Sequence, residues 1–371
     1  MTKGMAARVT VSWLTVLSFF FFLSTWLQDL SSPLVLTGLF VWLFAVIMWA
    51  AFGVVHEAEE LAILLGEPKG TLVLTLSIVI IEVALVAAVM LGAQGAPTLG
   101  RDTMFAVLMI VLNGVVGLGL LIGGLKHREQ SYNLQGAASY LSILVPLTIV
   151  ALILPNFTTS SNAGTLTNFQ AGMFSCFTVG LYAAFLITQT GRHRSYYVHV
   201  RDGEAPVAVA MAPMPPPPLD RKKVFTHTIL LFANILPIVL LAKGLAKILD
   251  YGITSLELPA ALGGVVIAAI VFAPEGISAL RAVARNDLQR TINLCLGAAT
   301  STVGLTVPVV LAIGIFTGQT VILGLKPTEM TLLVMTLILS SMTFSNRRTT
   351  LLEGAVHIVV FLVYLVLVFN P

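Results

Sequence analysis

The sequence has little charge and little cysteine. Only 10% of its residues are Asp, Glu, Lys or Arg, against roughly 25% in an average soluble domain, whereas 57% are hydrophobic and the mean hydropathy is +0.97. Its 2 cysteines, Cys176 and Cys295, lie in apolar stretches, where a free cysteine behaves as a small hydrophobic residue. This composition excludes a soluble globular domain, and the cysteines indicate neither a disulfide framework nor a metal–thiolate site.

Sequence motifs for several classes of chemistry are also absent. No glycine-rich phosphate cradle of the G-x-x-x-x-G-K-[ST] type is present, so nothing indicates an ATP-driven pump, and energy must come from an ion gradient. The apolar stretches contain no two-His metal motif, no G-x-S-x-G elbow and no paired aspartates, so an intramembrane enzyme lacks support. We expect no enzyme activity, no cofactor and no nucleic-acid partner.

Long apolar stretches dominate what is present. A helix needs about 20 apolar residues to cross a hydrocarbon core of roughly 30 Å. Eleven such stretches can be read at 9–28, 34–55, 70–92, 103–125, 136–155, 168–190, 226–249, 260–284, 289–316, 327–344 and 351–369. The sequence therefore predicts an all-α polytopic membrane protein. The first stretch follows basic residues as a signal peptide does, but no A-x-A-like cleavage site comes after residues 19–22, so we expect a retained leading helix in residues 1–30.

The distribution of Lys and Arg predicts the orientation of these helices. If there are eleven helices, the N-terminus and every second loop carry 16 of the basic residues. These are Lys3, Arg8, Lys69, Lys126, Arg128, Arg192, Arg194, Arg201, Arg221, Lys222, Lys223, Arg281, Arg285, Arg290, Arg347 and Arg348. The other side carries 4, namely Arg101, Lys243, Lys247 and Lys326. By the positive-inside rule, the N-terminus is expected in the cytosol and the C-terminus outside.

A polar stretch at 191–225 divides the chain. It contains the prolines Pro213, Pro215, Pro216, Pro217 and Pro218, which cannot continue a helix, so we expect an exposed cytosolic linker. Five predicted helices precede it in residues 31–190 and five follow it in residues 226–371. Because five is odd, the two units would enter the membrane from opposite sides, which is the inverted-repeat plan of many secondary transporters.

A carboxylate lies in the middle of an apolar stretch in each half of the chain. Glu82 lies within the uncharged run from Gly70 to Gly92, and Glu275 follows Pro274 in the second half. A charge at bilayer depth costs roughly 2.5 to 3.5 kcal/mol on insertion scales, so such a residue indicates an ion path or a proton relay. For Glu275 an alternative is a position at a helix end, with the side chain reaching to the membrane surface.

The helices that follow these two stretches are rich in small and polar residues. They begin with the similar leads Arg101-Asp102-Thr103 and Arg285-Asn286-Asp287. Side-chain oxygens there can replace part of an ion's hydration shell. The candidate ligands are Asn113 and Ser301, with Asn293, Thr302 and Thr306 as secondary candidates. Asn113 could equally form a hydrogen bond between helices, and the hydroxyls could bond back to their own helix.

An acidic cluster lies at the predicted end of the second helix. It consists of His56, Glu57, Glu59 and Glu60, of which His56 and Glu60 are one helical turn apart. The cluster could be a solvated helix end. Alternatively, it could be a cytosolic mouth that raises the local concentration of cations or protons.

Several segments resemble one known family, the bacterial ChaA-type cation/proton antiporters of the calcium:cation antiporter (CAX-like) superfamily. These segments are Gly66 to Leu74 with Ile80 to Val83, Ala96 to Thr103, Pro274 to Gly276, and Gln289-Arg290, Asn293-Leu294 and Leu305 to Pro308. The resemblance runs from about residue 53 to 369. Some relatives carry an acidic cytosolic stretch between the halves, whereas this linker is net basic. We therefore expect this linker to be attracted to anionic lipid headgroups rather than to sense cations.

The resemblance implies a proton-coupled exporter of Ca²⁺, Na⁺ or K⁺ in a bacterial inner membrane. Glu82 and Glu275 would bind cation and proton in turn, and Asn113 and Ser301 would occupy the polar positions. The leading alternative is a cation channel that uses the same membrane carboxylates. The sequence leaves open which cation is transported, the stoichiometry and the oligomeric state.

Overall fold

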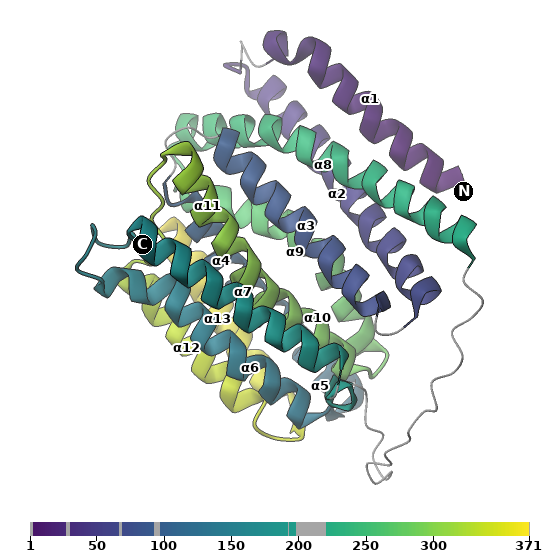
Figure 1. Ribbon diagram of the computed structural model, residues 1–371, viewed down its shortest axis with the longest axis vertical. Helices are drawn as coiled ribbons and strands as arrows, with labels where there is room; N and C mark the ends of the chain where they lie inside the picture. The colour runs from purple at the N-terminus through teal and green to yellow at the C-terminus, as the bar shows by residue number, and fades with distance from the viewer. Residues whose placement is uncertain are drawn as a thin grey trace. The chain divides into compact units, whose positions relative to one another are not determined.

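The computed structural model describes residues 3–26, 30–66, 69–92, 97–191, 193–197 and 220–370. Eleven long helical segments lie in these ranges, in the predicted order (Figure 1). They are α1 (Lys3–Trp26), α2 (Pro33–Leu65), α3 (Lys69–Gly92), α4 (Leu99–Met109) with η1 (Ile110–Val115) and α5 (Val116–His127), α6 (Leu134–Thr148) with η2 (Ile149–Ile153) and η3 (Leu154–Phe157), α7 (Asn168–Thr190), α8 (Arg221–Ser255), α9 (Ala261–Ala284), α10 (Leu288–Ser301) with η5 (Thr302–Thr306) and α11 (Val307–Thr317), α12 (Pro327–Thr343) and α13 (Leu351–Phe369).

Most of these segments are long and apolar enough to cross a membrane. Ten of them meet this description by length and composition, and α12 is shorter with 17 residues. The predicted fold class, an all-α polytopic membrane protein, is therefore confirmed. Several boundaries differ from the prediction, and the largest difference is at α2, which continues past residue 55 and through its acidic residues to Leu65. The helix can do so because Glu57 is buried and paired rather than solvated.

The chain forms two compact units that do not coincide with its two halves. Unit 1 comprises Met1–Leu99 and Pro216–Pro274, and unit 2 comprises Gly100–Pro215 and Glu275–Pro371. Each unit thus combines helices from before and after the predicted linker. The inverted relation between residues 31–190 and 226–371 stays a prediction, and the proline run of the linker lies outside the described residues.

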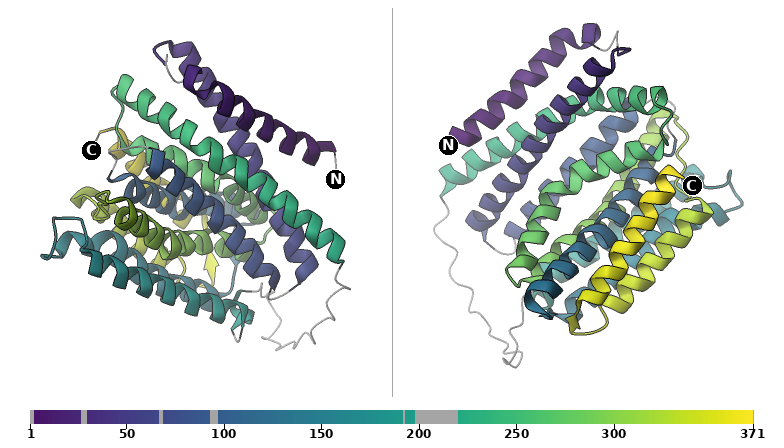
Figure 2. Two further views of the ribbon diagram at one scale, coloured as in Figure 1. Left: turned by 45° about the horizontal axis from the view of Figure 1, so that its top comes forward. Right: turned by 180° about the vertical axis from the view of Figure 1, so that it is seen from behind.

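Unit 1 is built around α2 and α8. These two long helices pack against each other, and α1 and α3 pack on both of them (Figures 1 and 2). The hydrophobic core at this contact includes Leu43, Ile47, Val54 and Leu245, each 0% exposed. The indole Nε1 of Trp13 on α1 donates a hydrogen bond to a main-chain carbonyl of α8, at 3.0 Å. The leading helix is therefore held to unit 1 by polar as well as apolar contacts.

Unit 2 contains a close contact between two helices. The helices α5 and α13 approach so closely that a Cβ atom on Gly354 would lie 2.6 Å from the main-chain nitrogen of Leu121. Small residues permit such contacts between membrane helices. Two short strands, β1 (Gln130–Ser131) and β2 (Arg348–Thr349), pair antiparallel at the ends of these helices. A short 3₁₀ turn, η4 (Arg194–Tyr197), follows α7.

The two helices rich in polar residues are interrupted by π-helical turns. The first turn, η1, separates α4 from α5, and the second, η5, separates α10 from α11. Pro308 follows η5 and has no main-chain N–H to donate to the carbonyl of Gly304, so a regular α-helix cannot continue there. Short π-helical turns are frequent at functional sites.

Candidate cation and proton site

Glu82 lies inside the third helix of the chain, in unit 1. Its side chain is 4% exposed, and the helix qualifies as a membrane span over Leu72–Leu91. The residue therefore occupies the interior of an apolar segment, as the sequence predicted. A buried carboxylate in such a segment must be paired, protonated or bound to a cation.

Glu275 lies in the part of α9 that belongs to unit 2. Its side chain is 6% exposed, and α9 continues beyond it to Ala284. The burial argues against the alternative of a helix-end carboxylate that reaches to the membrane surface. Pro274 lies within the same helix and leaves a carbonyl on the preceding turn without its usual donor. The thiol of Cys295 on α10 lies within electrostatic range of Glu275.

The predicted neutral ligands lie in or beside the π-helical turns of unit 2. Asn113 belongs to η1, Ser301 ends α10, and Thr302 and Thr306 belong to η5. All four side chains are buried, with exposures of 0%, 3%, 1% and 0% respectively. The turn η1 packs on α10, which continues directly into η5. The fold thus brings the two polar helices together as neighbours.

The amide of Asn113 is held by hydrogen bonds from two other helices. Its Nδ2 donates to Thr336 Oγ1 on α12 at 2.8 Å, and its Oδ1 accepts from His357 Nδ1 on α13 at 3.0 Å. The remaining ring nitrogen of His357, Nε2, accepts from Thr343 Oγ1 at 3.0 Å. These contacts support the alternative role of Asn113 as a residue that joins helices, and they leave the second lone pair of Oδ1 for a cation.

His357 is a residue that the sequence reasoning missed. It is 0% exposed and joins α13 to η1 and α12. A signal was present in the sequence, because an ionisable residue inside an apolar stretch of 351–369 indicates a functional position by default.

Two further candidates make hydrogen bonds that hold the protein together. Ser301 Oγ donates to the carbonyl of Ala298 on its own helix, at 3.0 Å. Asn293 Nδ2 donates to the carbonyl of Tyr197 at 2.7 Å, while its Oδ1 accepts from Gln289 at 3.0 Å. Burial raises the pKa of the Tyr197 hydroxyl. A ligand role for Ser301 or Asn293 stays a prediction.

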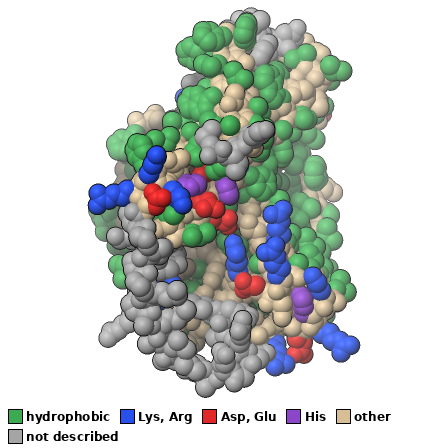
Figure 3. Space-filling view, turned by 90° about the vertical axis from the view of Figure 1, so that its right-hand side faces the viewer, with side chains coloured by type: hydrophobic (Ala, Val, Ile, Leu, Met, Phe, Trp, Pro, Cys, Tyr) green, Lys and Arg blue, Asp and Glu red, His purple; other side chains and the backbone are tan. Residues whose placement is uncertain are grey.

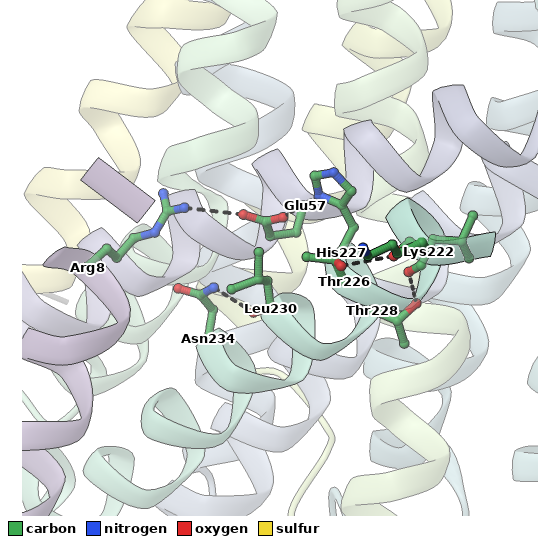
Figure 4. A network of polar contacts seen from close by, with 9 residues as sticks. Arg8, Glu57, Lys222, Thr226, His227, Thr228, Leu230 and Asn234 are labelled. Carbon is green, nitrogen blue, oxygen red and sulfur yellow. Dashed lines mark hydrogen bonds and ion pairs between the residues drawn. The ribbon is translucent and has the colours of Figure 1, made fainter. Parts of the chain in front are cut away.

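The acidic cluster on α2 is divided between surface and interior. His56 is exposed and Glu59 and Glu60 are partly buried, but Glu57 is fully buried. Glu57 contacts His227 on α8 and Arg8 on α1 (Figure 4). On the face shown in Figure 3, acidic, basic and His side chains gather in one area and hydrophobic side chains cover the neighbouring surface. The interpretation of the whole cluster as a solvated helix end therefore does not hold for Glu57.

The residues at the starts of the two polar helices, α4 and α10, make defined structural contacts in unit 2. Arg101 donates to Asp102 at 2.8 Å and to the carbonyl of Gly324 at 3.0 Å, and both side chains are buried. Asp287 caps α10 by accepting a hydrogen bond from the main-chain N–H of Arg290 at 3.1 Å. These residues anchor the starts of α4 and α10.

Within the described ranges, no group of three or more His, Cys, Asp or Glu side chains is arranged to hold a metal ion. A bound cation would therefore need neutral oxygens in addition to a carboxylate. Hydroxyl, amide and main-chain oxygens are suitable ligands for Ca²⁺ and for alkali-metal ions.

Comparison with known proteins identifies relatives of this chain and its family. It is 41% identical over 319 residues to y4hA of Sinorhizobium fredii, covering 86% of this chain and 85% of that protein. It is 37% identical over 323 residues to the sodium-potassium/proton antiporter ChaA of Escherichia coli, covering 87% and 86%. The solved structure of native YfkE shares the fold, with a TM-score of 0.70, 18% identity and coverage of 99% of each chain. Residues 35–191 and 226–370 match the family described as sodium/calcium exchanger protein. These matches cover nearly all of the predicted helices on both sides of the linker, and the chain belongs to the sodium/calcium exchanger protein family.

Proposed function

We propose that this protein is a secondary antiporter that exports Ca²⁺, Na⁺ or K⁺ in exchange for protons. The observation that carries the proposal is the burial of Glu82 and Glu275 inside apolar helices, one in each half of the chain. A cation and a proton can each neutralise such a carboxylate, so they compete for it. Two relatives are named accordingly, ChaA as a sodium-potassium/proton antiporter and YfkE as a Ca²⁺/H⁺ antiporter.

Competition for the carboxylates is sufficient to couple the two fluxes. Facing the cytosol, ionised Glu82 and Glu275 take up a cation with help from neutral oxygens near the π-helical turns. Reorientation exposes the site to the other side, where protons displace the cation, and the neutral protonated site returns. A channel with the same carboxylates would carry ions without this obligatory exchange.

The test is cation-dependent proton efflux from acid-loaded everted membrane vesicles. Ca²⁺, Na⁺ and K⁺ are added separately, and the internal pH is followed by a fluorescent dye. Antiport predicts alkalinisation that saturates with cation and persists when the membrane potential is clamped. Cation flux without proton movement would instead identify a channel.

We further propose a bacterial inner-membrane location with the N-terminus in the cytosol, because 16 basic residues lie on one side and 4 on the other if eleven helices cross. A reporter fused after Pro371 is expected to be external, and one inserted at residues 213–218 to be cytosolic. Accessibility of single cysteines at the same two places to a membrane-impermeant reagent provides an independent measurement. Placement of both on one side would contradict the helix count.

Substitution of a neutral ligand is expected to weaken cation binding less than substitution of a carboxylate. Loss of one uncharged oxygen ligand costs about 1 kcal/mol, so Asn113→Ala is expected to raise the half-saturating cation concentration about fivefold. Ser301→Ala should have less effect, because Ser301 already bonds to its own helix. Initial rates of exchange over a range of cation concentrations provide the measurement.

Two variants of α12 separate ligation by Asn113 from its structural role. Thr336→Val removes the partner of Asn113 Nδ2, and should lower the unfolding temperature while leaving the half-saturating concentration near wild type. Thr331→Ala, at an exposed position of the same helix, is the matched control. An equal rise in half-saturating concentration for Asn113→Ala and Thr336→Val would mean that Asn113 acts only by joining helices.

A further inference from the structure

A buried polar cluster in unit 1 has no part in the transport chemistry proposed above. It lies where three helices meet, with Arg8 and Ser12 from α1, Glu57 from α2, and His227 and Asn234 from α8. Ser12, Glu57 and Asn234 are each 0% exposed, and Arg8 is 9% exposed. Figure 4 shows Glu57 between Arg8 and His227. Charged groups at such a depth are costly to keep, so a role beyond packing is indicated.

The carboxylate of Glu57 is bound more closely by His227 than by Arg8. His227 Nδ1 lies 2.7 Å from Glu57 Oε2, and Arg8 Nη2 lies 3.6 Å from Glu57 Oε1. Because an ionised carboxylate can only accept, the Nδ1–H of the imidazole donates to it. With His227 neutral, the charges of Arg8 and Glu57 balance. A proton added to His227 leaves the cluster with one net positive charge.

The cluster contains buried polar atoms, both donors and acceptors, that make no hydrogen bond. Among the described residues, Glu57 Oε1, Asn234 Oδ1, Ser12 Oγ and Arg8 Nε are buried and make no hydrogen bond. Two of these atoms are close together, because a Cβ atom on Gly53 would lie 2.5 Å from both Arg8 Nε and Asn234 Oδ1. Buried acceptors are normally paired. Glu57 Oε1 is thus an unpaired acceptor on the same carboxylate that His227 contacts.

His227 also faces an open pocket. The pocket has a volume of about 410 Å³ and includes Lys222, Lys223, Thr226 and His227 in its lining. The His227 side chain is 18% exposed. The imidazole thus has Nδ1 directed to the buried carboxylate while its ring borders the pocket. Protons can reach the pair from this side without crossing the apolar core.

From this geometry we propose that His227 and Glu57 form a second proton-binding site, separate from the membrane carboxylates Glu82 and Glu275. In the binding step, a hydronium ion in the pocket gives a proton to His227 Nε2 and becomes water, and the imidazolium remains hydrogen-bonded to Glu57 through Nδ1–H. Release is the reverse step, so one proton enters and one leaves through the pocket. The inference that this proton also slows transport rests on the proposed antiport.

The surrounding charges determine the sign of the effect. Arg8 on α1 and Lys222 and Lys223 on α8 disfavour the added proton. Asp220 on α8 lines the same pocket and favours the added proton. The other titratable residues near Glu57 in the α2 sequence are His56, Glu59 and Glu60. The interior carboxylate of α3, a helix that packs on α2 and α8, is Glu82. Protonated His227 competes with Arg8 for Glu57 and so weakens the attachment of α1 to α2. We infer a lower maximal rate when the site is protonated. Under the proposed orientation, the site would limit proton import into an acidified cytosol.

The proton-binding step is tested by nuclear magnetic resonance on purified protein labelled with ¹⁵N-histidine. The chain has 6 His residues, and the signal of His227 is the one missing from His227→Gln. The expected result is an Nδ1–H tautomer at alkaline pH, hydrogen-bonded to Glu57, that converts reversibly to imidazolium when a proton is added. In the Glu57→Gln variant, His227 should lose its preference for the Nδ1–H tautomer, because the carboxylate that accepts from Nδ1–H is gone. An Nε2–H tautomer, or no titration while the protein stays folded, would overturn the proposal.

The effect on transport is tested separately in everted vesicles at saturating cation. The pH of the bath, which faces the pocket under the proposed orientation, is varied while the internal pH is fixed. Wild type should lose at least about half of its maximal rate at the acidic end, and His227→Gln should lose much less. Asp250→Asn, an exposed change on the same helix, is the control for wild-type behaviour. If His227 takes up a proton in the resonance experiment but wild type and His227→Gln have the same dependence of rate on pH, the site does not control the rate of transport. If no exchange is seen in any variant, the antiport proposal is wrong instead.

Discussion

Glu82→Gln and Glu275→Gln are each expected to abolish cation/proton exchange while the protein still inserts in the membrane. Glutamine keeps the size of the side chain but can neither bind a proton nor supply a negative charge. Loss of one partner of a buried charge pair costs about 3 to 5 kcal/mol, which corresponds to roughly a hundredfold or more in cation affinity. The measurement is cation-dependent proton efflux from everted vesicles, normalised to the amount of protein in the membrane.

The matched control for these variants is Glu129→Gln. Glu129 and Arg348 form an ion pair at 3.0 Å in which both side chains are more than half exposed, at 51% and 58%. Exposed pairs contribute little, so exchange should remain at the wild-type rate. Wild-type exchange by either interior variant would exclude that carboxylate from the transport site. Loss of exchange only together with loss of membrane insertion would mean a structural role.

Apparent cation affinity is expected to fall steadily as pH drops on the side where the cation binds. In the proposed mechanism, protons and cations compete for Glu82 and Glu275, so cation binding must displace the protons that occupy the site. Where the site is mostly protonated, the half-saturating cation concentration should rise about tenfold per pH unit for each proton displaced. The slope of a logarithmic plot therefore reports how many protons exchange for one cation.

The measurement is the half-saturating concentration in vesicles at a series of bath pH values, with the internal pH and the membrane potential held fixed. The maximal rate is recorded in parallel, because protonation of His227 is expected to change that rate rather than the affinity. A half-saturating concentration that stays constant from mildly acidic to alkaline pH would exclude shared carboxylates. Separate sites for the proton and the cation would then be required.

The sequence by itself determined the fold class and the placement of the two carboxylates inside apolar helices. Uninterrupted apolar stretches of membrane-spanning length leave the chain few options other than helices, because main-chain groups in lipid must be hydrogen-bonded within the segment. All eleven helical segments appear in the predicted order. The same reasoning located Glu82 and Glu275, since each lies within an apolar run of the sequence.

The tertiary structure alone decided which polar side chains are paired and with which helices. The pairing of Glu57 with His227 joins residues 170 positions apart, and that of Asn113 with His357 joins residues 244 positions apart. Hydrophobic periodicity describes one helix at a time and says nothing about such partners. A buried charge or amide is stable only where a distant helix supplies its partner. For that reason packing placed Glu57 in the interior, extended α2 to Leu65, and gave Asn113 its neighbours on α12 and α13.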